Sequence, residues 1–146
     1  MSDNFFKKIL IATDGSEKAE KAVAYGIDIA KATGAEVCAL YVVSTEHAGT
    51  ARTVMGWTGA FEEYLANKGG DATAYVEKLG KEAGVKVEPM YLKGIPAEKI
   101  LEYAEESNID LIVMGTQGAT GVQRFLIGSV AENVLRHSKV PVMIVR

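Results

Sequence analysis

The chain has 146 residues, 48% hydrophobic and 24% charged, which fits one globular domain with a proper core, and we expect residues 1–146 to form it. Its net charge of −3, from 16 basic and 19 acidic residues, is too small to indicate nucleic acid or an anionic membrane as a partner. The single cysteine excludes an internal disulfide, and neither a signal peptide nor an apolar run of about 20 residues is visible, so we expect a cytoplasmic protein.

The N-terminal part of the chain predicts a strand, a helix and a second strand. Residues 9–12 form a short apolar run that ends at a turn, which indicates a buried strand. Residues 16–33 carry apolar side chains at helical spacing, and Gly34 closes that helix. Residues 36–43 form a second apolar run, which predicts the second strand.

The segment that follows is expected to be irregular and then helical. Residues 44–56 show no clear period and predict a loop. Residues 57–66 and 71–83 both have a helical pattern, and Gly69-Gly70 stands between them. Because each glycine costs a continuous helix about 1 kcal/mol, we expect a broken or kinked helix here.

The C-terminal half continues the alternation of strands and helices. Residues 86–92 alternate in polarity and contain Pro89, which suits an edge strand because proline cannot donate to a ladder. Residues 96–107 predict a helix with Pro96 at its first position. The chain then predicts a strand, a helix and a last strand, at residues 109–114, 130–137 and 141–145.

Near-continuous apolar strands that alternate with helices predict an α/β protein whose parallel sheet carries helices on both faces. Five strands with helical crossovers suit a doubly wound, Rossmann-like open sheet in the order 3-2-1-4-5. In that order the connection reverses between the first and fourth strands, and ligands bind at the carboxyl ends of the strands beside such a point. We therefore expect a site between Thr13-Asp14 and Met114-Gly115.

A glycine-rich loop follows the fourth predicted strand. It contains Gly115, Gly118 and Gly121, and Gly128-Ser129 opens the next helix. Glycine lets backbone N–H groups approach a ligand, and a helix start supplies unpaired N–H groups and a partial positive charge. We therefore expect a phosphate-bearing ligand. The better-known phosphate loops are absent, because neither Gly-Lys-Ser/Thr nor Gly-x-Gly-x-x-Gly after the first strand occurs.

The spacing Gly115-x2-Gly118-x9-Gly128-Ser129 resembles the nucleotide-binding signature of the universal stress protein family, in its ATP-binding branch. The resemblance implies ATP as the ligand, with Mg²⁺ held through the phosphates and water. It also implies a symmetric homodimer in which the C-terminal strands pair antiparallel. The family's second helix is long, so the break expected here would be a departure from the family pattern. The likeness extends over essentially the whole chain, through residues 8–16, 94–97 and 140–142.

The same resemblance assigns the phosphate half of the site. It places backbone and hydroxyl contacts to the phosphates at Gly115, Gly118, Gly128 and Ser129. Each glycine taken alone has turn formation as its alternative role. Ser129-x-x-Glu132 is also a capping-box pattern, and both roles are compatible, because a capping hydroxyl can turn to a phosphate.

The nucleoside half takes its residues mainly from the first strand and the turn after it. The resemblance implies that Ala12 and Thr13 line the adenine side through their backbone and that Asp14 lies at the nucleoside. Asp14 with Glu17 is also a capping-box pattern, which is the alternative role. Apolar neighbours of the site, for which core packing alone is the alternative, are Val42, Met114 and Val130.

Catalytic and metal-binding patterns are not found. Gly-x-Ser-x-Gly is absent, and only Asp14 is a candidate base, so we expect no catalytic residue and at most slow ATP hydrolysis. His47 and His137 have no partners at ligand spacing, and Cys38 is expected to be a small buried hydrophobe. Three functions remain open: a nucleotide-dependent stress-response or signalling module, a slow ATPase, and a stress interaction protein that binds no nucleotide.

Overall fold

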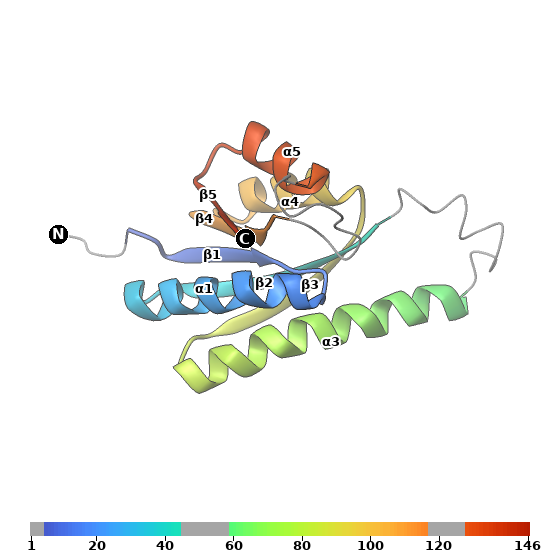
Figure 1. Ribbon diagram of the computed structural model, residues 1–146, viewed down its shortest axis with the longest axis horizontal. Coiled ribbons are helices and arrows are strands. Elements are labelled where there is room, and N and C mark those ends of the chain that lie inside the picture. Colours follow the sequence, from blue (N-terminus) through green and yellow to red (C-terminus); the bar gives the residue numbers. More distant parts are fainter. Residues whose placement is uncertain (1–4, 45–58, 117–127) are drawn as a thin grey trace.

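A computed structural model describes residues 5–44, 59–116 and 128–146 of the chain. The expected loop at residues 44–56 lies outside this part except for Ser44, which is the last residue of a strand and not part of a loop. His47, Gly118 and Gly121 also lie outside the described residues. The described strands form one parallel five-stranded sheet in the order β3-β2-β1-β4-β5, which confirms the predicted doubly wound topology (Figure 1). Their bounds are β1 Lys8–Ala12, β2 Glu36–Ser44, β3 Val87–Gly94, β4 Leu111–Gly115 and β5 Val142–Val145.

The helices lie on both faces of the sheet, as the alternating pattern predicted. The helices α1 and α3 cover one face, and α4 and α5 cover the other (Figure 1). Each face has its own buried apolar cluster, centred on Ile9 and Ile11 under α1 and on Leu10 and Ile112 under α4 and α5. The helices run over α1 Glu17–Thr33, α3 Gly59–Ala83, α4 Pro96–Glu106 and α5 Ser129–His137.

The expected break at Gly69-Gly70 is wrong, because α3 continues from Gly59 to Ala83 without interruption. Gly69 is buried against the ring of Tyr41 on β2. A Cβ atom at this position would lie only 2.6 Å from Tyr41 Cδ2. The glycine therefore lets the helix approach the sheet closely, and packing against the sheet outweighs the low helix propensity of two glycines.

The strand β3 lies at one edge of the sheet, as the proline in its sequence predicted. Pro89 is paired in register with Ala39 of β2. The other edge is β5, which pairs only with β4 among the described strands. The central strand is β1 and β4 is its neighbour, so the reversal of connection falls between these two strands and places the candidate site at their carboxyl ends.

Candidate functional site

The turn after β1 is held by short side-chain hydrogen bonds. The Thr13 N–H donates to the carbonyl of Leu40 at 3.0 Å, which ties the end of β1 to β2. Asp14 Oδ1 accepts from both the backbone N–H of Ser16, at 2.9 Å, and its hydroxyl, at 2.6 Å. Gly15 adopts a left-handed conformation with φ of 79° and donates to Thr13 Oγ1 at 3.1 Å. These bonds fix the direction of the chain at the predicted nucleoside side.

The interpretation of Asp14 as a helix cap is wrong. The N-cap of α1 is Ser16, whose hydroxyl oxygen accepts from the N–H of Ala19 at 3.3 Å. Asp14 instead lies two residues before the cap and stabilises the turn. Its carboxylate accepts a hydrogen bond from the backbone N–H two residues later, as is common for aspartate in turns. Its carboxylate thus lies at the carboxyl end of a central strand, with Thr13 beside it almost completely buried.

The carboxyl end of β4 has a different set of partners from the rest of the strand. Its register with β1 ends at Val113, which pairs with Ile11. Its register with β5 continues for two more residues, through Met114 to Gly115, which pairs with Val145. Beyond Val113 the strand is therefore held on the β5 side alone in the described ladder, at the point where the topology reverses.

The start of α5 is hydrogen-bonded through its backbone to the residue that follows β4. Gly128 is the N-cap, with φ −69° and ψ 159°, and as a glycine it supplies no capping side chain of its own. The Gly128 N–H donates to the carbonyl of Thr116, so the two ends of the segment between them are joined by a hydrogen bond. The first turn of α5 therefore has N–H groups and the positive end of the helix dipole, and its N-cap residue contributes no side-chain hydrogen bond to them.

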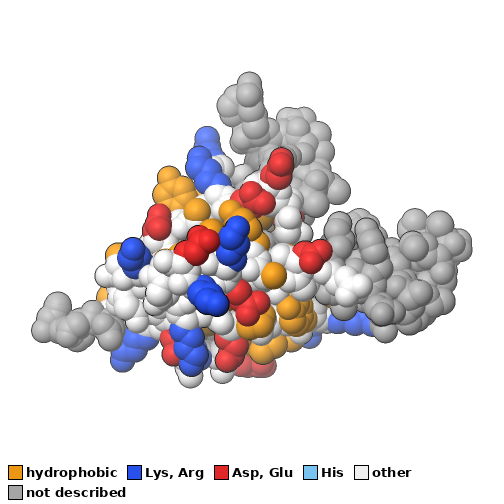
Figure 2. Space-filling view, turned by 90° about the horizontal axis from the view of Figure 1, so that it is seen from below, with side chains coloured by type: hydrophobic (Ala, Val, Ile, Leu, Met, Phe, Trp, Pro, Cys, Tyr) orange, Lys and Arg blue, Asp and Glu red, His pale blue; other side chains and the backbone are white. Residues whose placement is uncertain are grey.

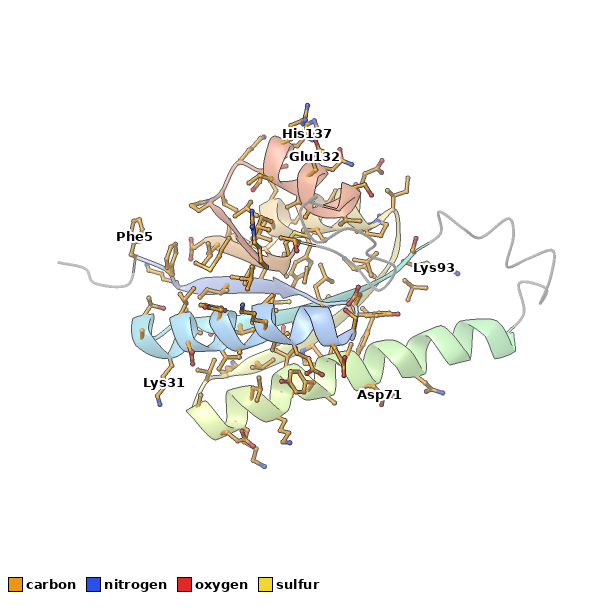
Figure 3. All side chains as sticks on the ribbon, in the orientation of Figure 1. Phe5, Lys31, Asp71, Lys93, Glu132 and His137 are labelled. Carbon is orange, nitrogen blue, oxygen red and sulfur yellow. The ribbon has the colours of Figure 1, made fainter. Side chains whose placement is uncertain are left out.

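The capping-box interpretation of Ser129 and Glu132 is also wrong. Ser129 is the first helical residue, and the N-cap is its neighbour Gly128. Glu132 forms an ion pair with Arg136 at 2.7 Å on the outer side of α5, where it is labelled together with His137 (Figure 3). Ser129 is exposed at the helix start.

The apolar candidates gather on one face of the sheet. Met114 is buried, whereas Ala12, Val42 and Val130 are partly buried, and all four pack in the same cluster under α4 and α5. They come from β1, β2, β4 and α5, so the fold unites four separate segments. The structure thus groups the described candidates at the carboxyl side of the central strands, and Gly118 is the one candidate outside the described residues.

Cys38 is buried, as expected, but the sequence did not indicate its polar partner. The Cys38 thiol on β2 donates to the hydroxyl of Tyr103 on α4 at 3.2 Å. Burial raises the pKa of the Cys38 thiol. Burial, followed by the hydrogen bond to Cys38, raises the pKa of Tyr103 to about 12. Both groups are therefore neutral near pH 7, and the pair serves packing between β2 and α4.

The described ranges contain neither a metal-binding cluster nor a membrane-spanning helix. No group of three or more His, Cys, Asp or Glu side chains is placed to hold a metal ion there. No described helix is both long and apolar enough to span a membrane. On the face shown in Figure 2, basic and acidic side chains are interspersed, without a large area of one sign.

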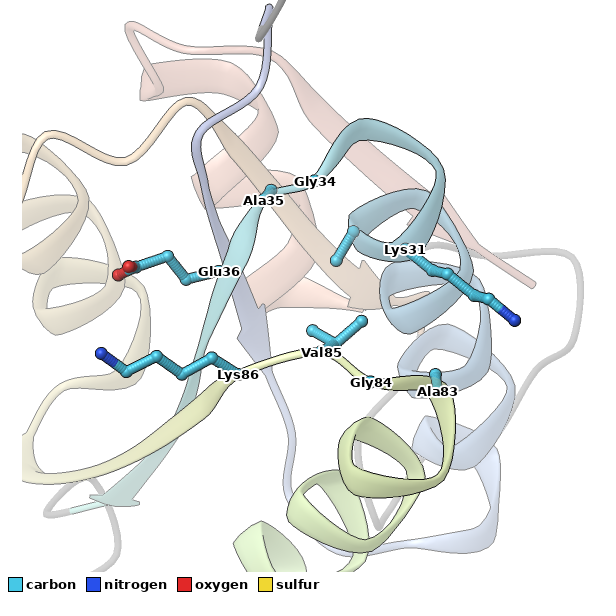
Figure 4. A pocket seen from close by; sticks show the side chains of 9 residues that line it. Lys31, Gly34, Ala35, Glu36, Ala83, Gly84, Val85 and Lys86 are labelled. Carbon is cyan, nitrogen blue, oxygen red and sulfur yellow. The ribbon is translucent and has the colours of Figure 1, made fainter.

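A surface hollow of about 430 Å³ lies at the amino ends of the strands, on the opposite side of the sheet from the candidate site (Figure 4). It is bounded by the ends of α1 and α3 and the starts of β2 and β3. Glu36 and Lys86 extend to one side of it and Lys31 to the other. None of the candidate residues lines it, so this hollow is separate from the site at the carboxyl ends of the strands.

The fold and this arrangement define a doubly wound α/β protein with a candidate anion site at its topological switch point. Comparison with protein families matches residues 5–146 to the Universal stress protein family (Usp). The chain therefore belongs to the universal stress protein family. It is 42% identical to Universal stress protein MJ0531 of Methanocaldococcus jannaschii over 144 residues, which cover 99% of this chain and 84% of that protein.

Solved structures of related proteins share the fold. The structure of MJ0577 from Methanocaldococcus jannaschii is 36% identical, covers 97% of this chain and 96% of its own, and has a TM-score of 0.72. A universal stress protein solved in complex with cAMP is 27% identical, covers 97% of both chains and has a TM-score of 0.68. The relatives thus match almost the full length of the chain.

Proposed function

We propose that the chain binds ATP at the carboxyl ends of β1 and β4 and works as a nucleotide-dependent stress-response or signalling module in the cytoplasm. The phosphates would lie at Gly115, Gly118, Gly128 and Ser129, and the nucleoside beside Thr13-Asp14. The observation that carries this proposal is the start of α5. Its N-cap, Gly128, supplies no capping side chain to the first-turn N–H groups, Ser129 is exposed, and this helix start lies at the switch point.

The residues at this site suit an anion that carries a flat aromatic base, whose faces can pack against apolar side chains. Backbone N–H groups and a hydroxyl favour phosphate oxygens, and the partly buried Ala12, Val42 and Val130 supply apolar surface beside them. Mg²⁺ would be held through the phosphates and water. The cAMP complex of a relative supports an adenine nucleotide as the class of ligand.

Release of endogenous ligand tests this function directly. Protein purified without added nucleotide is denatured, and the supernatant is analysed by chromatography for adenine nucleotides. The expected result is ATP or its hydrolysis products at up to one molecule per chain. Protein that releases none is then titrated with Mg-ATP, and absence of binding in both experiments would contradict the proposal.

The proposal includes a homodimer in which the β5 strands of two copies pair antiparallel. Val142, Met143 and Ile144 of β5 are apolar and only partly buried in one chain, at an edge that needs covering. The opposite edge strand, β3, carries Pro89, which disfavours pairing there. Val142→Pro is expected to weaken the dimer if this residue donates across the interface, as measured by sedimentation equilibrium.

A further inference from the structure

The side chain of Ser16 ties the turn after β1 to the first turn of α1. Its hydroxyl oxygen accepts from the N–H of Ala19 at 3.3 Å and thereby caps the helix. The same hydroxyl lies 2.6 Å from Asp14 Oδ1 and is the donor there, because an ionised carboxylate can only accept. One hydroxyl therefore connects the start of α1 to the carboxylate of Asp14, and bonds in series of this kind strengthen one another.

Asp14 receives two hydrogen bonds from this one residue. The backbone N–H of Ser16 also donates to Oδ1, at 2.9 Å. Because both donors use the same carboxylate oxygen, they hold the side chain of Asp14 in one rotamer before a ligand binds. None of the hydrogen bonds between described residues ends on Oδ2, so this oxygen is the one left to accept from a ligand.

The backbone on the other side of Asp14 is also held. The Thr13 N–H donates to the carbonyl of Leu40 at 3.0 Å, and the Gly15 N–H donates to Thr13 Oγ1 at 3.1 Å. Thr13 is buried and Asp14 is partly buried. A carboxylate that is fixed in this way has little freedom left to lose, and preorganisation of this kind increases affinity.

The charge of Asp14 decides which part of a nucleotide it can contact. A carboxylate repels phosphate groups and accepts hydrogen bonds only from O–H and N–H groups. ATP offers such donors at its ribose hydroxyls and at the amino group of adenine. The nucleoside half of the proposed site, beside Thr13-Asp14, lies within the described residues and is where these donors would be.

We infer that Ser16 is a positioning residue, whose hydroxyl and N–H hold the Asp14 carboxylate so that Oδ2 accepts a hydrogen bond from the nucleoside. The inference rests on the proposed function, because it takes ATP as the ligand. Ser16 does not contact the nucleotide and acts only through Asp14. Loss of its hydroxyl therefore weakens the binding of those nucleotides that carry the donor received by Asp14, and of no others.

A double-mutant cycle between Ser16 and Asp14 tests this role, with Mg-ATP dissociation constants measured by calorimetry. Ser16→Gly removes the hydroxyl, and glycine is tolerated at an N-cap. It should raise the dissociation constant about two- to tenfold, the effect expected when one side chain must be ordered on binding. In the Asp14→Ala background the same substitution should have no effect on binding. Ser16→Thr keeps the hydroxyl and is the matched control, which should bind ATP as the unmodified chain does.

Nucleotide analogues identify the donor and exclude a purely structural role. Candidate donors are missing one at a time from 2′-deoxy-ATP, from 3′-deoxy-ATP and from purine riboside triphosphate, which lacks the amino group. The unmodified chain should bind at least one of them more weakly than ATP, and Ser16→Gly should leave the affinity for that analogue unchanged. Circular dichroism checks the fold. If Ser16→Gly does not fold, Ser16→Asp replaces it, because aspartate caps a helix about as well as serine but cannot donate.

The outcomes separate this inference from the proposed function. ATP binding in which the effects of Ser16→Gly and Asp14→Ala simply add would overturn the positioning role and leave the proposed function standing. Equal weakening of ATP and all three analogues by Ser16→Gly, or equal affinity of the unmodified chain for all four nucleotides, would also overturn it. Failure of the unmodified chain to bind ATP at millimolar concentration would overturn the proposed function and this inference together.

Discussion

Ser16 and Ser129 differ by one position relative to the start of their helices. Ser16 is a true N-cap and also donates its hydroxyl to Asp14, whereas Ser129 stands one residue inside its helix. Ser16→Ala should therefore lower the free energy of unfolding by about 1 kcal/mol. Ser129→Ala should change it by less than about 0.5 kcal/mol.

Urea denaturation of both variants, followed by ATP titration of the second, measures this difference. Ser129→Ala is expected to weaken ATP binding by about tenfold, equivalent to about 1.4 kcal/mol, while leaving stability unchanged. If it instead destabilises the chain as much as Ser16→Ala does, the serine acts as a cap after all. Normal ATP affinity would remove Ser129 from the phosphate site.

The raised pKa of Tyr103 predicts a change in the free energy of unfolding at alkaline pH. Burial and the bond to Cys38 raise its pKa from 10.0 to about 12, so folding favours the neutral phenol. This contribution is complete below about pH 10 and is lost as the pH rises toward 12. Absorbance titration should find one of the six tyrosines ionising near pH 12, and Tyr103→Phe should remove that step and flatten the fall in stability. A Tyr103→Phe variant that retains the late ionisation would assign it to another tyrosine.

At the scale of elements, the strands and most helices follow from the sequence because their signals are local. Apolar runs bounded by turns predicted β1 and β4 closely, and Pro96 marked the first residue of α4. The break expected in α3 is wrong because it was predicted from helix propensity alone. Propensity describes the isolated helix, whereas Gly69 owes its place to contact with Tyr41, a residue on another element. Long-range contacts of this kind leave no periodic signal.

The two adjacent glycines of α3 give a matched prediction. A Cβ at Gly69 would meet the Tyr41 ring, whereas a Cβ at Gly70 would have no heavy atom within 4 Å. Gly70→Ala should raise the free energy of unfolding by up to about 1 kcal/mol through helix propensity. Gly69→Ala should lower it by about 1–3 kcal/mol, because the ring must move. Urea denaturation measures both, and equal effects of the two substitutions would contradict the packing account.

For the candidate site, the sequence predicted the strand order but not the residues that cap the two neighbouring helices. The carboxyl ends of β1 and β4 follow from strand order, which five apolar runs with crossovers imply. The alternative capping roles of Asp14 and Ser129 were wrong, because a capping-box pattern does not fix the residue at which the helix begins. Only backbone geometry distinguishes Ser16 and Gly128 as the actual caps.

At the scale of the whole molecule, we predict that the protein binds ATP without hydrolysing it rapidly. Rapid phosphoryl transfer needs an oriented water and usually a lysine or arginine at the γ-phosphate. Arg124 is the only cationic residue between Gly115 and Ser129 in the sequence. We expect turnover at least about a hundredfold below the 1 per second typical of slow enzymes. A phosphate-release assay on highly purified protein measures this rate, and turnover near 1 per second that disappears in Arg124→Ala would show an ATPase.

Titration calorimetry with Mg-ATP on nucleotide-free protein tests the central claim most directly. A micromolar dissociation constant, equivalent to about −8 kcal/mol, is the expected result, with one ATP bound per chain. At about a hundredfold excess over that constant, ATP should stabilise the fold by about 2.7 kcal/mol and raise Tm by several degrees. No heat of binding and no change in Tm at millimolar Mg-ATP would contradict the assignment of this site to ATP.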